Sequence, residues 1–105
     1  METLRILFLG DVCGAFGVKA LCAHLPALRR ETGAELVVVN AENAAPSNGI
    51  TKAVAEELFF AGADVLTGGN HSFRKKESYE FLDSEPRVLR PANFPATAPG
   101  VVMAA

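Results

Sequence analysis

Three short polar segments of this 105-residue chain each follow an apolar run, and their residue types suit a metal-dependent reaction. The first segment contains Asp11, the second contains Glu42 and Asn43, and the third contains Asn70 and His71. Carboxylate and amide oxygens are ligands of hard divalent cations, and histidine can donate a proton near neutral pH. Together these residue types predict a metal site that hydrolyses phosphate esters.

The elements that must position these side chains follow from the apolar runs at residues 4–9, 35–39 and 63–67. Each run is short, rich in aliphatic residues and followed by a helical stretch, which is typical of buried parallel strands. The carboxyl ends of parallel strands line one crevice of an open α/β sheet. We therefore expect an α/β fold of the order β-α-β-α-β-α, with the polar segments at one edge of the sheet.

Three helices and a short final strand complete the expected elements. Pro26 should kink the first helix or split it, and Gly33 should end it. Thr51 is a suitable N-cap for the second helix. The expected helices cover residues 17–31, 51–62 and 75–84, and the strand covers residues 87–89.

Each polar segment also has a purely structural interpretation. Asp11 could cap a helix or stabilise a turn, because aspartate is common at such positions. Residues 40–43 could form a capping cluster with Asn43 in the left-handed region, and His71 could be a hydrogen-bonded structural residue. Gly68 and Gly69 favour a functional His71, because glycine lets the backbone approach a ligand closely.

Composition and charge narrow the classes of protein. Half of the residues are apolar, which indicates a globular chain, and the net charge of −2 argues against broad binding of nucleic acids. No apolar run approaches the roughly 20 residues of a membrane span, and the chain starts without a basic leader segment. We expect a cytoplasmic protein with no membrane partner. Cys13 and Cys22 have no metal or redox spacing, and both are expected to be packing residues.

Several basic residues could hold a phosphate. Arg90 is the best candidate, because the following proline makes its loop rigid. Arg87 is a further candidate, whereas Lys75 and Lys76 suit the solvated face of a helix.

Four segments resemble the YmdB-like branch of the calcineurin-like metallophosphoesterases. They read ILFLGDVCG at residues 6–14, NAENAA at 40–45, GNH at 69–71 and RPANFP at 90–95. The resemblance extends over nearly the whole chain. It implies an α/β sandwich with two metal ions that hydrolyses 2′,3′-cyclic nucleotides to nucleoside monophosphates.

The resemblance also implies a role for each site residue. Asp11 and Asn43 would bind one metal ion, Asn70 would bind the other, and Glu42 would bridge both. His71 would donate a proton to the leaving oxygen of a small phosphodiester substrate. Two divalent ions are expected, either Mn or Fe, with Mg also compatible with these ligands.

Two departures from the family pattern affect the expected function. Family members usually have Trp-Asp where this chain has Phe73-Arg74, so a base replaces an acid beside the site. The family also completes its metal site with three histidines from a C-terminal half. Residues 1–105 are therefore expected to be the N-terminal part of one metallophosphoesterase domain, weak or inactive alone. An apolar edge at residues 101–103 would favour a homo-oligomer.

Two other classes of function remain open at this point. One is a nucleotide-binding module of the doubly wound type. Residues 10–17 lack its Gly-x-Gly-x-x-Gly spacing, and Asp11 would repel a pyrophosphate. The other is a non-catalytic interaction or assembly domain.

Overall fold

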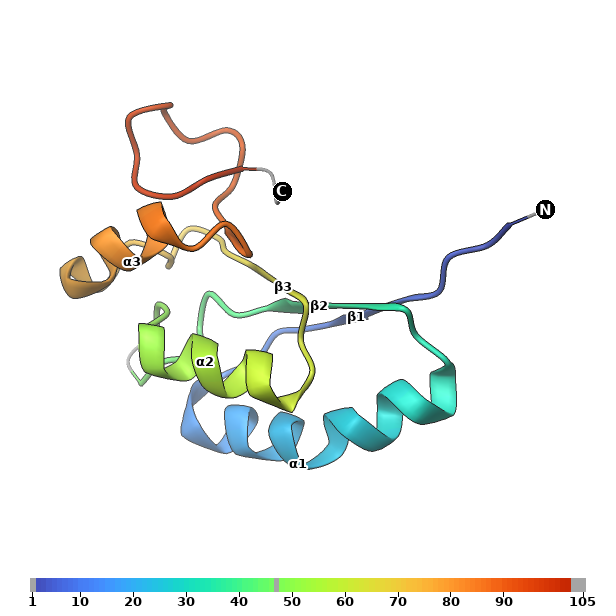
Figure 1. Ribbon diagram of the computed structural model, residues 1–105. Helices are drawn as coiled ribbons and strands as arrows, with labels where there is room; N and C mark the ends of the chain where they lie inside the picture. Colours follow the sequence, from blue (N-terminus) through green and yellow to red (C-terminus); the bar gives the residue numbers. More distant parts are fainter. Residues whose placement is uncertain (1, 47, 103–105) are drawn as a thin grey trace.

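Four parallel strands form a single sheet in the order β1-β2-β3-β4 (Figure 1). The computed structural model describes residues 2–46 and 48–102. The strands are β1 (Ile6–Leu9), β2 (Leu36–Asn40), β3 (Val65–Thr67) and β4 (Val88–Leu89). The helices are α1 (Gly14–Thr32), α2 (Lys52–Ala61) and α3 (Tyr79–Ser84), with a 3₁₀ turn, η1 (Lys76–Ser78), before α3. The predicted α/β class, with its parallel strands and alternating helices, is confirmed.

The core lies between one face of the sheet and the helices α1 and α2, which run below it in Figure 1. The strand register aligns Leu9 of β1 with Val39 of β2 and Leu66 of β3. Leu25 of α1 and Leu58 of α2 are completely buried in the same cluster. This packing fixes the carboxyl ends of the strands relative to the loops that follow them.

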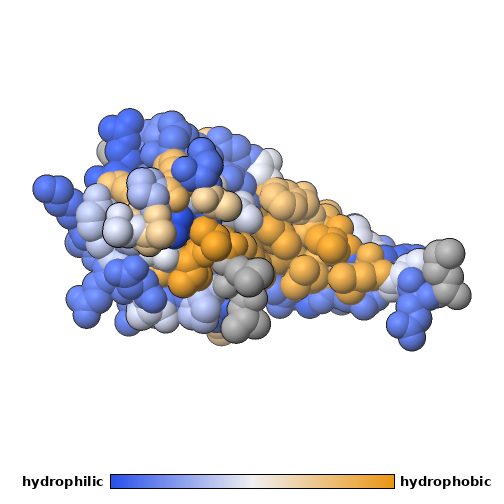
Figure 2. Space-filling view, turned by 90° about the horizontal axis from the view of Figure 1, so that it is seen from above, coloured by the Kyte–Doolittle hydropathy of each residue, from blue (hydrophilic) through white to orange (hydrophobic). Residues whose placement is uncertain are grey.

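The opposite face of the sheet exposes apolar side chains. Leu4, Ile6 and Phe8 have 59%, 53% and 64% of their surface exposed. Figure 2 looks down on this face and shows apolar surface running along the molecule. The apolar edge expected at residues 101–103 is described only in part, because Met103 lies outside the described residues. Val101 pairs with Leu89 in a parallel bridge, and the expected self-association stays a prediction.

Helix α1 begins at Gly14, three residues before the predicted start at Gly17. The earlier start has a tertiary cause, because the Gly14 N–H donates to the Asn43 carbonyl at 2.9 Å. Pro26 lies inside one continuous helix, whose axis turns near its middle in Figure 1. Gly33 ends the helix in the left-handed conformation, as predicted.

Helix α2 begins as expected, because the Thr51 hydroxyl accepts a hydrogen bond from the Val54 N–H at 3.3 Å. The third predicted helix is wrong in form, since a 3₁₀ turn occupies Lys76–Ser78 and only Tyr79–Ser84 is α-helical. The Ser78 hydroxyl donates to the Ile50 carbonyl and therefore caps no helix. This bond instead joins the 3₁₀ turn to the loop before α2.

The two cysteines differ in burial. Cys22 is half-buried and packs against the core, as expected. The prediction for Cys13 is wrong, because Cys13 is exposed at the N-cap of α1. In the described part of the chain, no helix is both long enough and apolar enough to cross a membrane.

Candidate active site

Backbone hydrogen bonds join the loops that follow the first three strands. The Val12 N–H donates to the Asn40 carbonyl at 3.3 Å, and the Ala41 N–H donates to the Thr67 carbonyl at 2.9 Å. A third bond joins Gly14, at the start of α1, to Asn43. Together these three hydrogen bonds bring the polar segments after β1, β2 and β3 to one edge of the sheet.

Four of the five predicted site residues form a chain of polar contacts at this edge. The Nδ2 of Asn43 donates to both carboxylate oxygens of Asp11, at 3.1 and 3.0 Å. The Oδ1 of Asn43 lies 2.5 Å from Nδ1 of His71, and this Nδ1 lies 3.6 Å from Oε2 of Glu42. Because an amide oxygen only accepts hydrogen bonds, Nδ1 of His71 carries the hydrogen and Nε2 is left for another partner.

Glu42 and His71 are joined by a backbone contact as well as by their side chains. The His71 backbone N–H donates to Oε2 of Glu42 at 3.3 Å. The side chains of His71 and Glu42 retain 29% and 19% of their exposure, so both are reachable from solvent. A reacting group can therefore approach them without a change of fold.

The glycine pair makes room for groups of the protein itself, and its expected approach to a ligand stays a prediction. A Cβ built on Gly69 would overlap the carboxylate of Glu42, so only glycine leaves room for this acid. A Cβ on Gly68 would instead meet the Ser72 hydroxyl and, at 2.9 Å, the Leu89 carbonyl oxygen. The absence of a side chain at Gly69 therefore leaves room for a residue of the candidate site, Glu42. The absence of a side chain at Gly68 leaves room for the packing of Ser72 and of the β4 backbone.

Ser72 is a positioning residue that was not predicted from the sequence. It is 2% exposed, and its hydroxyl accepts a hydrogen bond from the Gly69 N–H at 2.8 Å. Its own N–H donates to the Gly69 carbonyl at 3.1 Å. A serine three residues after a glycine was the only signal for this turn, and it is common in sequences.

The loop after β2 is shaped by a turn farther along the chain than expected. The left-handed conformation predicted for Asn43 under the capping interpretation is wrong. Within the described part of the chain, Asn48 is the one non-glycine residue with a positive φ, of 72°. The Gly49 N–H donates to the Glu42 carbonyl at 2.6 Å. This bond closes the loop and leaves the Asn43 side chain to join Asp11 to His71.

Asn70 is placed differently from the other predicted site residues. It is exposed, and its side chain makes no hydrogen bond to the cluster among the described residues. Within residues 2–46 and 48–102, no group of three or more His, Cys, Asp or Glu side chains could hold a metal ion.

Arg90 and Arg87, the predicted phosphate ligands, are engaged elsewhere. Arg90 donates to the carbonyls of Gly100, Pro91 and Phe94 and so braces the loop after β4. Arg87 pairs with Glu85 at 2.7 Å. The hydrogen bond from Arg87 holds the pKa of Glu85 below its ordinary value.

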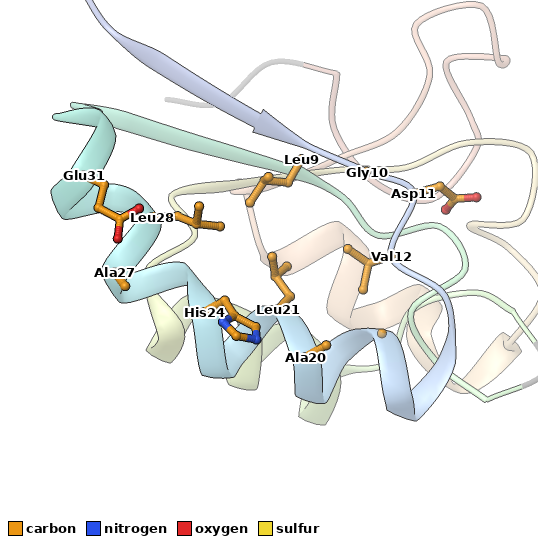
Figure 3. Close-up of a pocket in the computed structure, with 11 residues that line it drawn as sticks. Leu9, Gly10, Asp11, Val12, Ala20, Leu21, His24, Ala27, Leu28 and Glu31 are labelled. Atoms are coloured by element: carbon orange, nitrogen blue, oxygen red, sulfur yellow. The ribbon is translucent and has the colours of Figure 1, made fainter.

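A separate hollow of about 500 Å³ lies along the outer edge of β1 (Figure 3). Its walls are mainly apolar, with Leu9 on the strand side and Leu21 and Leu28 on α1. The Asp11 carboxylate points away from this hollow in Figure 3. The polar cluster at the strand ends, rather than this hollow, is the candidate active site.

Cys13 lies beside the cluster. Desolvation raises the pKa of its thiol, and the Asp11 carboxylate adds to the increase by its negative charge and by accepting a hydrogen bond. A thiol with a raised pKa holds its proton more firmly and is a poor nucleophile.

Comparisons with known proteins show the family of this chain. The family described as YmdB-like protein matches residues 7–105. A 2′,3′-cyclic-nucleotide 2′-phosphodiesterase of Bacillus subtilis (strain 168) is 41% identical over 97 residues, which are 92% of this chain and 37% of that protein. The chain thus spans little more than a third of this relative's length.

Two solved structures share the fold. A hypothetical protein from Thermus thermophilus superposes with a TM-score of 0.85 at 41% identity, over 93% of this chain and 38% of the other. A phosphatase from Mycoplasma pneumoniae superposes with a TM-score of 0.88 at 31% identity, over 96% and 37%. The fold of the described chain is thus the fold of the corresponding part of a phosphatase.

Proposed function

This chain belongs to the YmdB-like protein family, and on that premise we propose that it contributes to a metal-dependent phosphodiesterase site. The proposed reaction is the hydrolysis of 2′,3′-cyclic nucleotides to nucleoside monophosphates. The name of the Bacillus subtilis relative supports this substrate, and the phosphatase from Mycoplasma pneumoniae supports the wider class.

The observation that carries the proposal is the polar chain from Asp11 through Asn43 and His71 to Glu42. It joins two acids, an amide and an imidazole at the carboxyl ends of parallel strands, where α/β proteins bind ligands. Capping of helices alone does not require an imidazole in the cluster, and Nε2 of His71 stays available for a ligand because Nδ1 contacts Asn43.

The donor set fits a hard divalent cation. Asp11 and Glu42 offer carboxylate oxygens, and Asn43 and Asn70 can offer amide oxygens, which are the ligand types of Mn²⁺, Fe²⁺ and Mg²⁺. Glu42, with two carboxylate oxygens, would bridge two ions. Such ions would neutralise the phosphate and lower the pKa of a bound water, which makes a hydroxide available for attack on phosphorus.

Asn70 has a distinct part in this proposal. Its exposed side chain is not committed to any hydrogen bond with the cluster, so it can turn toward a ligand. We assign it to the second ion on the resemblance of Gly69-Asn70-His71 to the family motif.

His71 would act as the general acid. Hydrolysis breaks one bond between phosphorus and a ribose oxygen, and this oxygen must receive a proton as it leaves. The Nδ1 hydrogen of His71 is directed to Asn43, so Nε2 is the atom that can deliver the proton.

The test is hydrolysis of adenosine 2′,3′-cyclic phosphate in the presence of Mn²⁺, with the monophosphate product identified by chromatography. The wild-type chain should release product, even if slowly, and Glu42→Gln should release at least about tenfold less. Glu31→Gln, which changes an exposed acid of α1, is the matched control. Equal rates for Glu42→Gln and the control would refute the proposed site.

A further inference from the structure

The segment directly after His71 carries three consecutive positive charges. Arg74, Lys75 and Lys76 are three of the ten basic residues of a chain whose net charge is −2. Among the described residues, none of the three forms an ion pair, whereas Arg29 and Arg87 do. Arg74 and Lys76 are exposed. The concentration of unpaired positive charge at this one place requires an explanation.

Backbone contacts fix this segment against the candidate active site. The Arg74 N–H donates to the His71 carbonyl at 3.1 Å, which closes a turn. A Cβ built on Gly49 would lie 3.2 Å from the Arg74 Cβ, 3.4 Å from the His71 carbonyl oxygen and 3.6 Å from the Lys75 Cγ. Gly49 itself donates to the Glu42 carbonyl, so the basic segment has a defined position relative to both Glu42 and His71.

We infer that Arg74, assisted by Lys75, recognises a second phosphate on the substrate, and this inference rests on the proposed function. The reacting phosphate belongs beside Asp11, Glu42 and Nε2 of His71, whereas Arg74 lies across a turn from His71. The turn holds the backbone of Arg74 beside the site, and its exposed side chain suits another anionic group of the same ligand. Arginine presents several donors in a planar fork that matches phosphate oxygens.

The 5′-phosphate of a nucleotide has the required chemistry, because the ribose separates it from the 2′,3′-cyclic phosphate. Two sources would present it. A mononucleotide would carry it as a terminal group with nearly two negative charges, and the 3′ end of an oligonucleotide would carry it as a diester with one. The inference concerns the shared phosphate group, and the choice of substrates separates the two sources.

The exposed location also sets the conditions for the test. Interactions between solvent-exposed charges are screened by salt, with a Debye length of about 10 Å at 0.1 M ionic strength. The preference for the second phosphate should therefore weaken as salt is added. A preference that came from shape alone would not change with salt.

The test compares three substrates in the presence of Mn²⁺: adenosine 2′,3′-cyclic phosphate, its 5′-phosphorylated form, and a dinucleotide that ends in a 2′,3′-cyclic phosphate. Arg74→Gln should raise KM about tenfold for the 5′-phosphorylated substrate and leave that for the unphosphorylated substrate unchanged. Arg30→Gln, an exposed residue near the distant end of α1, removes the same charge and should change neither. If Arg74→Gln also raises KM for the dinucleotide, the second phosphate can belong to the end of an oligonucleotide. If KM for the dinucleotide does not change, the second phosphate must be the terminal group of a mononucleotide.

Calorimetric titration separates failure of this inference from failure of the proposed function. Adenosine 3′,5′-bisphosphate should bind the wild type more tightly than adenosine 3′-phosphate does, and Arg74→Gln should remove the difference, whether or not turnover is detected. Absence of turnover with this binding pattern intact would refute the proposed reaction alone. Equal affinities of the wild type for the two nucleotides, or an Arg74→Gln effect equal to that of Arg30→Gln, would overturn the inference.

Discussion

The neighbouring glycines 68 and 69 should respond differently to the same substitution, because different groups lie against them. In Gly69→Ala the new Cβ would overlap the Glu42 carboxylate, which ends a flexible side chain and can move away. The fold would lose the hydrogen bond between the His71 N–H and Glu42, worth about 0.5–1.5 kcal/mol. In Gly68→Ala the Cβ would lie 2.9 Å from the Leu89 carbonyl oxygen, which is backbone and has little freedom to move. Overpacking of this kind costs about 1–3 kcal/mol.

Two measurements on each variant separate these effects. Urea denaturation should show Gly68→Ala to be the less stable variant. The ¹H–¹⁵N spectrum of Gly69→Ala should be close to that of the wild type except around Glu42 and His71, and its affinity for Mn²⁺ should be the more strongly reduced. The reasoning would be refuted if Gly69→Ala were as destabilised as Gly68→Ala while the Glu42 and His71 signals stayed unchanged.

Three further predictions concern single residues. His71→Ala should lower phosphodiesterase turnover by about 10²–10⁴-fold and keep Mn²⁺ binding, because a proton donor is not a metal ligand. If elemental analysis showed that metal is lost together with activity, His71 would instead be a metal ligand. Thr51→Ala should cost about 1 kcal/mol in urea denaturation, since it removes the cap on the Val54 N–H, and unchanged stability would disprove the cap. Glu85→Gln should cost up to about 1 kcal/mol near neutral pH. Because folding lowers its pKa, ionised Glu85 stabilises the fold at pH values above the ordinary carboxyl range. The difference in stability between the wild type and Glu85→Gln should therefore disappear as the pH falls through the lowered pKa. A difference that persisted in acid would contradict this prediction.

The elements that the sequence predicted well are those with a local physical cause. The aliphatic runs are short and bounded by polar residues, so the parallel strands followed from their pattern. Thr51 and Gly33 have side-chain and backbone properties that determine helix ends almost regardless of context. The edge of the sheet that carries the polar segments followed from the parallel topology alone.

The features that the sequence did not predict depend on contacts between distant segments. The start of α1 depends on a bond from Gly14 to Asn43, and the shortened third helix depends on the bond of Ser78 to Ile50. Arg90 appeared available for a phosphate because the carbonyls that it braces belong to an irregular loop. Periodicity carries no information about such partners.

In the candidate site, too, the residue types could be read from the sequence, whereas the contacts between them could not. The residue types at positions 11, 42, 43 and 71 indicated the chemistry, but not that Asn43 would stand between Asp11 and His71. The close fit of Glu42 against Gly69 is likewise a tertiary fact, although the glycine pair hinted at a close approach. The metal-binding and catalytic roles of these residues stay predictions.

Calorimetric titration with Mn²⁺ shows whether the polar cluster at the strand ends is a metal site, and it does not require turnover. The titration compares the wild type with Asp11→Asn and with Glu31→Gln, which removes an exposed acid at the other end of α1. We expect measurable binding of Mn²⁺ to the wild type and to Glu31→Gln, and an affinity at least about tenfold lower for Asp11→Asn. Equal affinities for all three proteins, or no binding to the wild type, would contradict this expectation.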